Sequence, residues 1–469
     1  MMTAFTIFVL GYTIVLNGFY MLFNILAFFH LRRYMGRVPI AEFHRVFRSR
    51  FFPSISLLVP AYNESVNICE SVQSLLMLQY PEYEVVVIND GSTDDTLARL
   101  IDRFKLKGNP WALGKIVPCK TIRAVYTSEN HPNLFVIDKE NGGKADALNA
   151  GINVSKHQLF CAIDGDSILE KDCLLKIVRP FLTHRHTIAA GGIVRIANGC
   201  TISHGNVDHI DLPKGHLERF QVLEYLRSYL FGRVGLDFLG CTLVISGAFG
   251  LFKKEAVVAA GGYLASSIGE DMELVVRLHH LYRKRNQPYS ISFVPDPVCW
   301  TEVPADWHTW FKQRNRWQRG LMDSLFRHIG MLCNPRYGRI GMIAMPFFFF
   351  LEMLSPIIES LGYIFLFSGW ISGILNVKFA VLMLTVMLVL GINLSLASLC
   401  LEELSFKRYP RVKAIIILFF YAFIENFGYR QIHALCRLKG TIDYFRGKKS
   451  WGAMTRRGFT LENPALNPR

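Results

Sequence analysis

Residues 3–29 carry no acidic or basic side chain, and this apolar stretch constrains the fold more than any other feature of the sequence. A helix of this length can cross the roughly 30 Å hydrocarbon core of a bilayer. No positive charge precedes the stretch and no small-residue cleavage site follows it, so it differs from a cleaved signal peptide. We therefore expect residues 1–30 to form a retained N-terminal transmembrane anchor.

The segment after this anchor is rich in arginine. Its arginines are Arg32, Arg33, Arg37, Arg45, Arg48 and Arg50. Because positively charged flanks stay on the cytoplasmic side, they place the long polar middle of the chain in the cytoplasm. The sequence therefore predicts an integral protein of a bacterial-type inner or plasma membrane, with a cytoplasmic domain at residues 31–300.

Apolar stretches return near the C-terminus. Within residues 340–438 we expect about three transmembrane segments, at 340–371, 378–401 and 414–435. The basic tail at 439–469 conflicts with this count, because a third full crossing would place the tail outside. Either the last segment is re-entrant, or the proline-containing first stretch is not a simple span.

Two acidic residues interrupt the first of these stretches. Glu352 and Glu359 lie in "FFFFLEMLSPIIESLGY". Because a charge is costly in hydrocarbon, we expect both side chains to face a polar channel or a partner helix rather than lipid.

Composition indicates a chain with both soluble and membrane parts, since hydrophobic residues make up 51% of it. The formal net charge of +15 would suit a nucleic-acid binder, but the basic residues crowd beside the apolar segments, where anionic lipid headgroups lie. We therefore expect membrane lipid, and not nucleic acid, as a partner. The ten cysteines form no CxxC pair, which indicates reduced packing residues.

The middle of the chain alternates short apolar runs with helical patterns. The expected strands are "ISLLVP", "YEVVVIND", "LFVIDK", "LFCAIDGD", "TIAAGGIVRI" and "ISFVPDPV". Helical patterns such as "KADALNAGINVS" separate several of them. This order predicts a parallel α/β sheet.

Polar side chains follow several of these strands. They are Asn63, Glu64, Asn89, Asp90, Asp164 and Asp166. In a parallel sheet ligands bind beyond the carboxyl ends of the strands, so these side chains should meet in one crevice. Alternatively, "VPAYNES" and "NDGSTDDT" are only helix-capping turns.

The "DGD" at residues 164–166 places two carboxylates around a glycine, directly after an apolar strand. Because buried like charges repel, they imply a cation partner. Oxygen ligands suit Mg²⁺ or Mn²⁺, which usually share their coordination with a diphosphate. A lone DxD is also common in turns.

Two further segments allow two interpretations each. In "GEDMEL", Glu270 and Asp271 are either an ordinary acidic helix start or a catalytic base. In "HTWFKQRNRWQRG", a helix would set Gln313, Arg316 and Trp317 on one face, where arginine can grip phosphate and indole can pack on a sugar. The same residues would suit an amphipathic interfacial helix, and we expect such helices at 301–339.

The ordered set "VPAYNE", "NDGSTDD", "GGKADALN", "DGD", "SGAFG", "GED" and "QRNRW" resembles the membrane-embedded family-2 inverting glycosyltransferases, which include cellulose, hyaluronan, chitin-oligosaccharide and poly-N-acetylglucosamine synthases. The resemblance implies an α/β GT-A nucleotide-diphospho-sugar transferase domain and an α-helical transmembrane bundle.

The resemblance also implies roles for individual residues. Nucleotide-sugar binding falls to Ala61, Tyr62, Glu64, Asp90, Lys144, Asp164 and Arg316. Asp164 and Asp166 would hold Mg²⁺ or Mn²⁺, and the acceptor would meet Ser246, Gly247, Ala248, Gln313 and Trp317.

"GED" stands where the family has "TED", with Gly269 in place of threonine. The resemblance therefore makes Asp271, with Glu270 beside it, the catalytic pair. Asp271 would deprotonate the acceptor hydroxyl in a single inverting displacement.

The basic tail contains "KSWGAMTRRGF" at 449–459, which resembles the gating segment of hyaluronan synthases or is a basic amphipathic surface segment. The implied function is a metal-dependent, processive transferase. It would polymerise and extrude a β-linked polysaccharide from a UDP-sugar, by family branch UDP-N-acetylglucosamine. The implied partners are the growing glycan and membrane lipid, with a small accessory membrane subunit as a further candidate. The alternatives are transfer of a single sugar to a polyprenyl-phosphate lipid and a non-catalytic scaffold subunit of an export complex.

Overall fold

The computed structural model describes residues 2–36, 52–109, 114, 116–203, 206–409 and 411–448. The chain divides into two compact units. Among the described residues, the α/β unit comprises 52–109, 114, 116–203, 206–212 and 242–303, and the helical unit comprises 2–36, 213–241, 304–409 and 411–448. Pro213–Cys241 thus packs with the helices, although it falls inside the predicted 31–300 domain.

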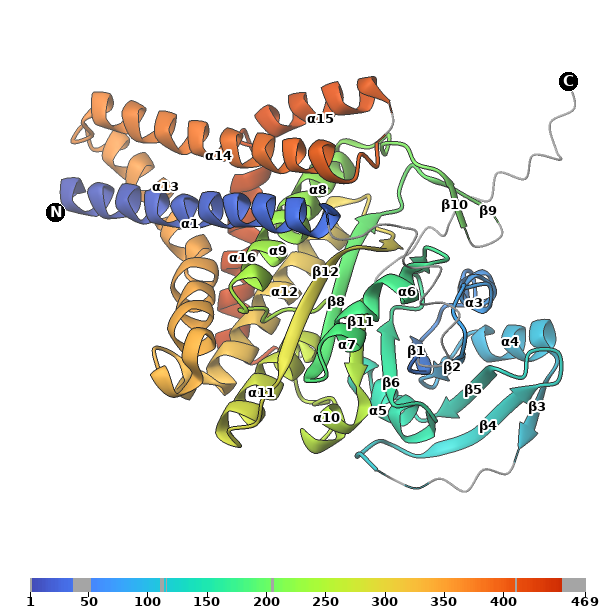
Figure 1. Cartoon of the computed structure of the whole chain (residues 1–469). Coiled ribbons are helices and arrows are strands. Elements are labelled where there is room, and N and C mark those ends of the chain that lie inside the picture. The colour runs from blue at the N-terminus through green and yellow to red at the C-terminus, as the bar shows by residue number, and fades with distance from the viewer. Residues whose placement is uncertain are drawn as a thin grey trace, which may run out of the picture. The chain divides into compact units, whose positions relative to one another are not determined.

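The α/β unit is built on a ten-stranded sheet of order β3-β4-β5-β2-β1-β6-β11-β8-β12-β7 (Figure 1). Its strands are β1 Ile55–Ala61, β2 Tyr83–Asn89, β3 Leu106–Asn109, β4 Ile122–Ser128, β5 Leu134–Lys139, β6 Leu159–Ile163, β7 Ile168–Leu169, β8 Thr187–Ile196, β11 Phe249–Lys253 and β12 Ser290–Thr301. A separate antiparallel pair is formed by β9 Thr201–Ser203 and β10 Asn206–His209.

The sheet is mixed, whereas the sequence predicted a parallel one. Strands β5, β2, β1 and β6 are mutually parallel, but β11 runs antiparallel between β6 and β8, and β3 and β4 are antiparallel at one edge. The parallel strands are buried and appear in the sequence as continuous apolar runs, so they could be predicted. Strand β4 is half-exposed and mixes polar with apolar residues, so the sequence gives no clear apolar run for this antiparallel strand.

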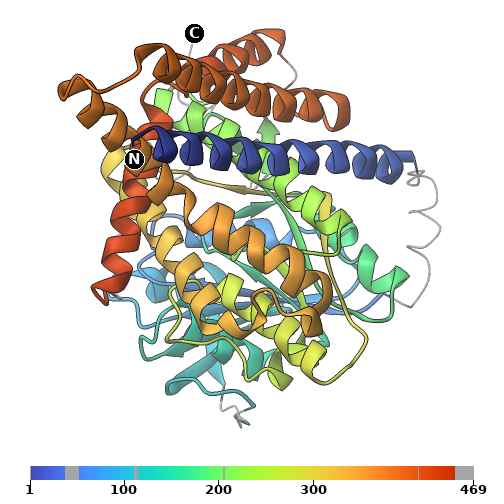
Figure 2. The ribbon, with the colours of Figure 1, turned by 90° about the vertical axis from the view of Figure 1, so that its left-hand side faces the viewer.

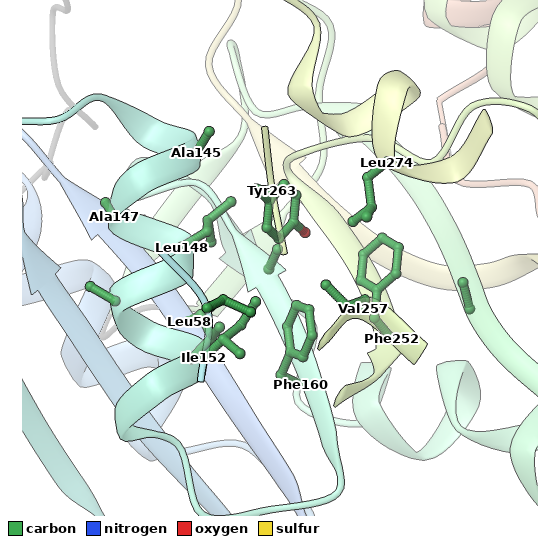
Figure 3. Packing of buried hydrophobic residues seen from close by; sticks show 14 of the residues in the cluster. Leu58, Ala145, Ala147, Leu148, Ile152, Phe160, Phe252, Val257, Tyr263 and Leu274 are labelled. Atoms are coloured by element: carbon green, nitrogen blue, oxygen red, sulfur yellow. The ribbon is translucent and has the colours of Figure 1, made fainter. Parts of the chain in front are cut away.

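Helices flank this sheet in the α/β unit. They are α3 Ile68–Leu76, α4 Thr96–Phe104, α5 Lys144–Val154, α6 Cys173–Ile177, α7 Arg179–Thr183, α10 Lys254–Ala259 and α11 Glu270–Lys284. Figure 3 shows Leu148 and Ile152 of α5 packed towards Leu58 of β1, with Phe160 of β6 and Leu274 of α11 in the same core. This apolar core fixes α5 and α11, and therefore fixes the first residues of both helices.

The helical unit contains the apolar segments. Its elements are α1 Met2–Gly36, α8 His216–Tyr225, the π-helical η1 Leu226–Arg233, α9 Val234–Phe238, α12 Trp307–Arg327, η2 Ile329–Met331, η3 Pro335–Tyr337, the π-helical η4 Ile340–Ala344 and η5 Phe347–Met353, α13 Ser355–Ile371, α14 Val377–Ser405, α15 Val412–Ile424 and α16 Tyr429–Phe445. Helices α1 and α14 lie side by side in both views (Figures 1 and 2).

Among the described residues, three helices are long and apolar enough to cross a membrane: Phe5–Gly36, Ile340–Ile371 and Val377–Ser405. Large apolar side chains such as Phe8 and Leu382 are exposed on them, as lipid contact requires. Their length and composition are those of a membrane protein.

The last apolar segment, expected at 414–435 as a crossing or a re-entrant segment, is divided into two helices. Helices α15 and α16 meet at a bend of 62°, so the pair is a broken span or a re-entrant loop. Glu425 lies at the bend and accepts hydrogen bonds from Arg227 at 2.5 Å and from Arg430 at 2.9 Å, and Gly428 has a positive φ of 108°. The buried ion pairs and the glycine conformation give the chain a reason to turn there.

Glu352 confirms the expectation of a partner helix. Its carboxylate accepts a hydrogen bond from Tyr20 of α1 at 2.5 Å and lies 3.7 Å from the Arg437 guanidinium of α16. Glu359 instead accepts a hydrogen bond from Tyr363 of its own helix at 2.8 Å. All ten cysteines are free thiols, but Cys333 and Cys400 are exposed and do not fit the prediction of packing residues.

Candidate active site

The loops after β1 and β2 are joined by hydrogen bonds. Asp90 donates its backbone N–H to the Ala61 carbonyl at 2.9 Å, and the Asn63 side-chain oxygen accepts from the Thr93 N–H at 2.8 Å. Ala61 is buried at the end of β1, whereas Tyr62 is half-exposed. The two polar strand ends predicted from sequence are therefore fixed against each other.

Asp90 is the centre of a buried ionic group. Lys139 is fully buried, and its ammonium lies 2.6 Å from both the Asp90 and the Asp146 carboxylates. The other bonds to the Asp90 carboxylate come from the backbone N–H groups of Gly142 at 3.0 Å and Gly143 at 2.7 Å. These contacts hold the loop that leads into α5.

Lys144, the first residue of α5, lies among three carboxylates. Its ammonium pairs with Asp164, at the carboxyl end of β6, and lies 3.7 Å from Glu270 at the start of α11. It also donates to the Gly247 carbonyl at 3.2 Å. Burial lowers the pKa of Lys144, but the nearby negative charges of Asp164, Glu270 and Asp271 raise it by more than burial lowers it. The pKa of Lys144 is therefore above its ordinary value, and the side chain stays protonated.

Asp271 is held by backbone amides. Its carboxylate accepts hydrogen bonds from Gly247 N–H at 3.0 Å and from Met272 N–H at 2.8 Å. An added Cβ at position 247 would lie 2.8 Å from the Lys144 ammonium and 3.4 Å from the Asp271 carboxylate, so a larger residue there would displace the end of the Lys144 side chain. The turn before β11 therefore lies directly against both charged groups.

The glycine in the turn at Asp164–Asp166 has a structural role. A Cβ on Gly165 would lie 3.2 Å from the Pro60 carbonyl oxygen of β1, so the glycine permits close approach of two backbone segments. Asp166 is buried. Asp164 and Asp166 offer only oxygen ligands, the type that Mg²⁺ and Mn²⁺ take, and a bound diphosphate could complete such a site.

The "QRNRW" segment lies in helix α12 of the helical unit. Gln313 and Arg316 are partly buried, and Trp317 keeps 42% of its surface exposed. Between them Arg314 is buried and pairs with Glu224 of α8 at 2.9 Å. The sequence interpretation assigned no role to Arg314.

Ten of the residues predicted from sequence fall into three groups. Contacts within the α/β unit bring together Lys144, Asp164, Gly247, Glu270 and Asp271. A second group, Ala61 and Asp90, is joined at the ends of β1 and β2. The third group, which belongs to the helical unit, is Gln313, Arg316 and Trp317.

Sequence reasoning missed Lys139 and Arg314, two of the buried cations among the described residues. Each lies beside a residue that was predicted: Lys139 ends a predicted strand, and Arg314 follows Gln313. Neither has a local signal for burial, because lysine and arginine are exposed by default.

Comparison with known proteins identifies the family. The sequence model described as glycosyl transferase family group 2 matches residues 159–401, which is more than half of the chain. The chain belongs to glycosyl transferase family group 2. A second model, glycosyl transferase family 2, matches residues 56–117.

Curated relatives of this group 2 chain include poly-beta-1,6-N-acetyl-D-glucosamine synthases. One from Staphylococcus epidermidis is 28% identical over 320 residues, which cover 68% of this chain and 66% of that relative. One from Staphylococcus aureus (strain COL) is 31% identical over 273 residues, which cover 58% of this chain and 56% of that relative. The chain thus matches less than two thirds of the length of these relatives.

Among solved structures, a mannosyltransferase from Pyrobaculum calidifontis in complex with GDP-Man and Mn²⁺ covers 90% of this chain and 99% of its own, with a TM-score of 0.55 and 18% identity. At this identity the likeness concerns the fold. It confirms the predicted class, a GT-A α/β domain with a helical region that contains the candidate transmembrane segments.

Proposed function

We propose that this protein is an inverting glycosyltransferase that polymerises a β-linked polysaccharide from a UDP-sugar, with UDP-N-acetylglucosamine as the donor. The observation that carries the proposal is a cluster at the carboxyl end of β6 and the first residues of α5 and α11. Its members are Lys144, Asp164, Glu270 and Asp271. The curated relatives, which are poly-beta-1,6-N-acetyl-D-glucosamine synthases, support the choice of sugar.

In this proposal Asp271 is the general base. Its carboxylate is oriented by two backbone N–H groups, so it needs little reorganisation to accept a proton from the acceptor hydroxyl. Glu270 lies beside it and contributes to the field around Lys144. The oxygen freed of its proton would attack the anomeric carbon opposite the diphosphate, which inverts the configuration.

Lys144 is proposed as a fixed positive charge for the diphosphate. Its ammonium now pairs with Asp164 and would exchange part of this contact for phosphate oxygens when the donor binds. The remaining donor contacts are assigned to Ala61, Tyr62, Glu64, Asp90 and Arg316. Those of the acceptor are assigned to Ser246, Gly247, Ala248, Gln313 and Trp317.

Asp164 and Asp166 would hold Mg²⁺ or Mn²⁺ together with the diphosphate. When bound, the metal would stabilise the negative charge that develops on the leaving group. The structure of the Pyrobaculum calidifontis mannosyltransferase in complex with GDP-Man and Mn²⁺ supports this assignment.

The helical unit is proposed to anchor the chain in membrane lipid with the α/β unit in the cytoplasm, and to export the product while elongation continues. The candidate spans and the arginine-rich flank support this orientation. A small accessory membrane subunit is a further proposed partner. The gating segment predicted at 449–459 lies outside the described residues.

The test is incubation of the detergent-purified full chain with Mg²⁺ or Mn²⁺ and a panel of radiolabelled UDP-sugars, followed by sizing of the product. We expect high-molecular-weight, glycosidase-sensitive material from UDP-N-acetylglucosamine. Label that stays at the size of a lipid or a single sugar would contradict polymerisation and favour transfer to a polyprenyl-phosphate carrier. Absence of transfer with every donor would favour the scaffold alternative.

A further inference from the structure

Arg314 occupies a buried position inside the "QRNRW" segment of α12. Only 1% of its side chain is exposed, and its guanidinium lies 2.9 Å from Glu224 and 3.3 Å from the Gln221 side-chain oxygen, both on α8. The guanidinium also donates to the Gln313 side-chain oxygen and lies 4.1 Å from the centre of the Trp317 ring. One side chain therefore contacts two of the three residues predicted to bind ligand on this helix.

The surroundings of Arg314 keep it in place. Glu224 also accepts a hydrogen bond from Tyr429 at 2.6 Å, so α8, α12 and α16 meet at this carboxylate. On the other side, the ring centre of the buried Trp310 lies 5.6 Å from the guanidinium. A buried ion pair of this kind adds little net stability, so its presence calls for another explanation.

The contact with Trp317 restricts an exposed aromatic ring. A planar guanidinium stacks on an indole face, which a lysine ammonium cannot do in the same way. The exposed part of the Trp317 ring is therefore presented in one orientation. A ring held this way offers an apolar platform to a sugar without first losing rotational freedom.

The contact with Gln313 restricts an amide. Arginine has only donors, so the Gln313 oxygen must face Arg314 and its NH₂ group must point elsewhere. Gln313 is thereby set as a hydrogen-bond donor. Its preferred ligand group is an acceptor, such as a sugar hydroxyl oxygen or an acetamide carbonyl.

We propose that Arg314 is a positioning residue for the glycan acceptor: it orients Trp317 to pack on a sugar ring and Gln313 to donate to an oxygen of that sugar. The proposal rests on the proposed function of this protein as a polysaccharide synthase. It assigns Arg314 no contact with the reacting atoms.

The test compares wild type with Arg314→Lys and Trp317→Phe in the full chain. Lysine keeps a charge for Glu224 but loses the planar stack. Both variants should lower, by about tenfold, the ratio of sugar built into glycan to UDP released, while the KM for UDP-N-acetylglucosamine stays at the wild-type value. The fluorescence emission of Trp317 is obtained by subtracting the spectrum of Trp317→Phe. In Arg314→Lys this emission should shift to longer wavelength.

Arg327→Lys is the matched control, because Arg327 pairs with Asp323 at 2.9 Å in the last turn of the same helix. If Arg314→Lys does not fold, the double variant Arg314→Gln with Glu224→Gln replaces it, since it removes both buried charges. A wild-type ratio, or an unchanged Trp317 emission, would overturn the proposal. If wild type itself makes no glycan from any UDP-sugar, the proposed function fails, and the emission comparison still decides whether Arg314 orients Trp317.

Discussion

Asp271 combines two properties that are usually separate: it lies in the first turn of a helix, and it lies near the partly buried Lys144 ammonium. Acidic residues in the first turn of a helix stabilise it through the helix dipole, which was the ordinary interpretation of "GED". The structure adds Lys144 and the Gly247 N–H, which lie outside that helix. Helix stabilisation alone does not explain these contacts, and this favours the proposed base.

Asp271→Asn should lower kcat by about 10²- to 10⁴-fold, because asparagine cannot take the acceptor proton. The KM for the UDP-sugar should change little, since Asp271 is not proposed to bind the donor. UDP release under steady-state conditions measures both constants. Asp102→Asn, in an exposed ion pair with Lys105, is the control, and near-normal turnover of Asp271→Asn would refute the assignment.

Gly247→Ala should lower turnover on the order of 100-fold, because its Cβ would displace the Lys144 ammonium from a position 2.8 Å away. Since the end of a flexible side chain can move, the melting temperature should stay close to that of wild type. Gly108→Ala is the matched control, because its Cβ would make an ordinary 3.7 Å contact with Tyr126. Equal activity of the two variants would contradict a role for Lys144 at this position.

At the scale of secondary structure, helix α11 is fixed at both its start and its middle. His279 is buried, with its ring nitrogens 2.8 Å from the Tyr289 hydroxyl and 2.8 Å from the Thr242 carbonyl oxygen. Burial lowers the pKa of His279 to about 4. The neutral ring fits this site, whereas a protonated ring would present a second N–H towards Tyr289.

The free energy of unfolding should therefore fall as the pH is lowered from about 6.5 to about 4. In this window the unfolded chain binds a proton at His279 and the folded chain does not, which costs about 3 kcal/mol in total. Denaturation at several pH values measures the effect. His279→Gln should lose this part of the pH dependence, whereas His184→Gln, at an exposed position, should keep it. If the free energy of unfolding of His279→Gln falls with pH as steeply as that of wild type, the prediction is wrong.

The sequence predicts those elements whose signal is local. Strands β5 and β8 have the bounds of the apolar runs from which they were predicted, and α11 begins at Glu270, directly after Gly269. Strand β11 was not predicted, because its five residues begin within "SGAFG" and show no distinct pattern of their own. The break between α15 and α16 depends on Arg227, which is remote in the sequence.

The candidate site was predicted from the sequence in two ways. Asp164 is polar and directly follows a predicted strand, whereas the roles of Lys144 and Asp271 came from the family resemblance. The structure brings the three side chains together. Lys139 and Arg314 could not be predicted, since a buried cation is recognised only when its distant carboxylates, such as Glu224, are placed beside it.

At the scale of the whole molecule, the proposed function requires a divalent metal. Removal of metal with EDTA should abolish glycan synthesis, and Mg²⁺ or Mn²⁺ should restore it. Asp166→Asn should raise the metal concentration needed for half-maximal turnover. Unchanged activity after chelation would contradict the metal role of Asp164 and Asp166.

The group around Lys144 has a consequence for how the substrate arrives. Three carboxylates and one ammonium give it a formal charge of −2, since three negative charges exceed one positive charge by two. Such a group repels a free diphosphate and attracts a divalent cation. On the proposed function, the true substrate is therefore the preformed metal chelate of the nucleotide sugar. Turnover should then follow the concentration of that chelate, and uncomplexed nucleotide sugar should compete poorly for entry.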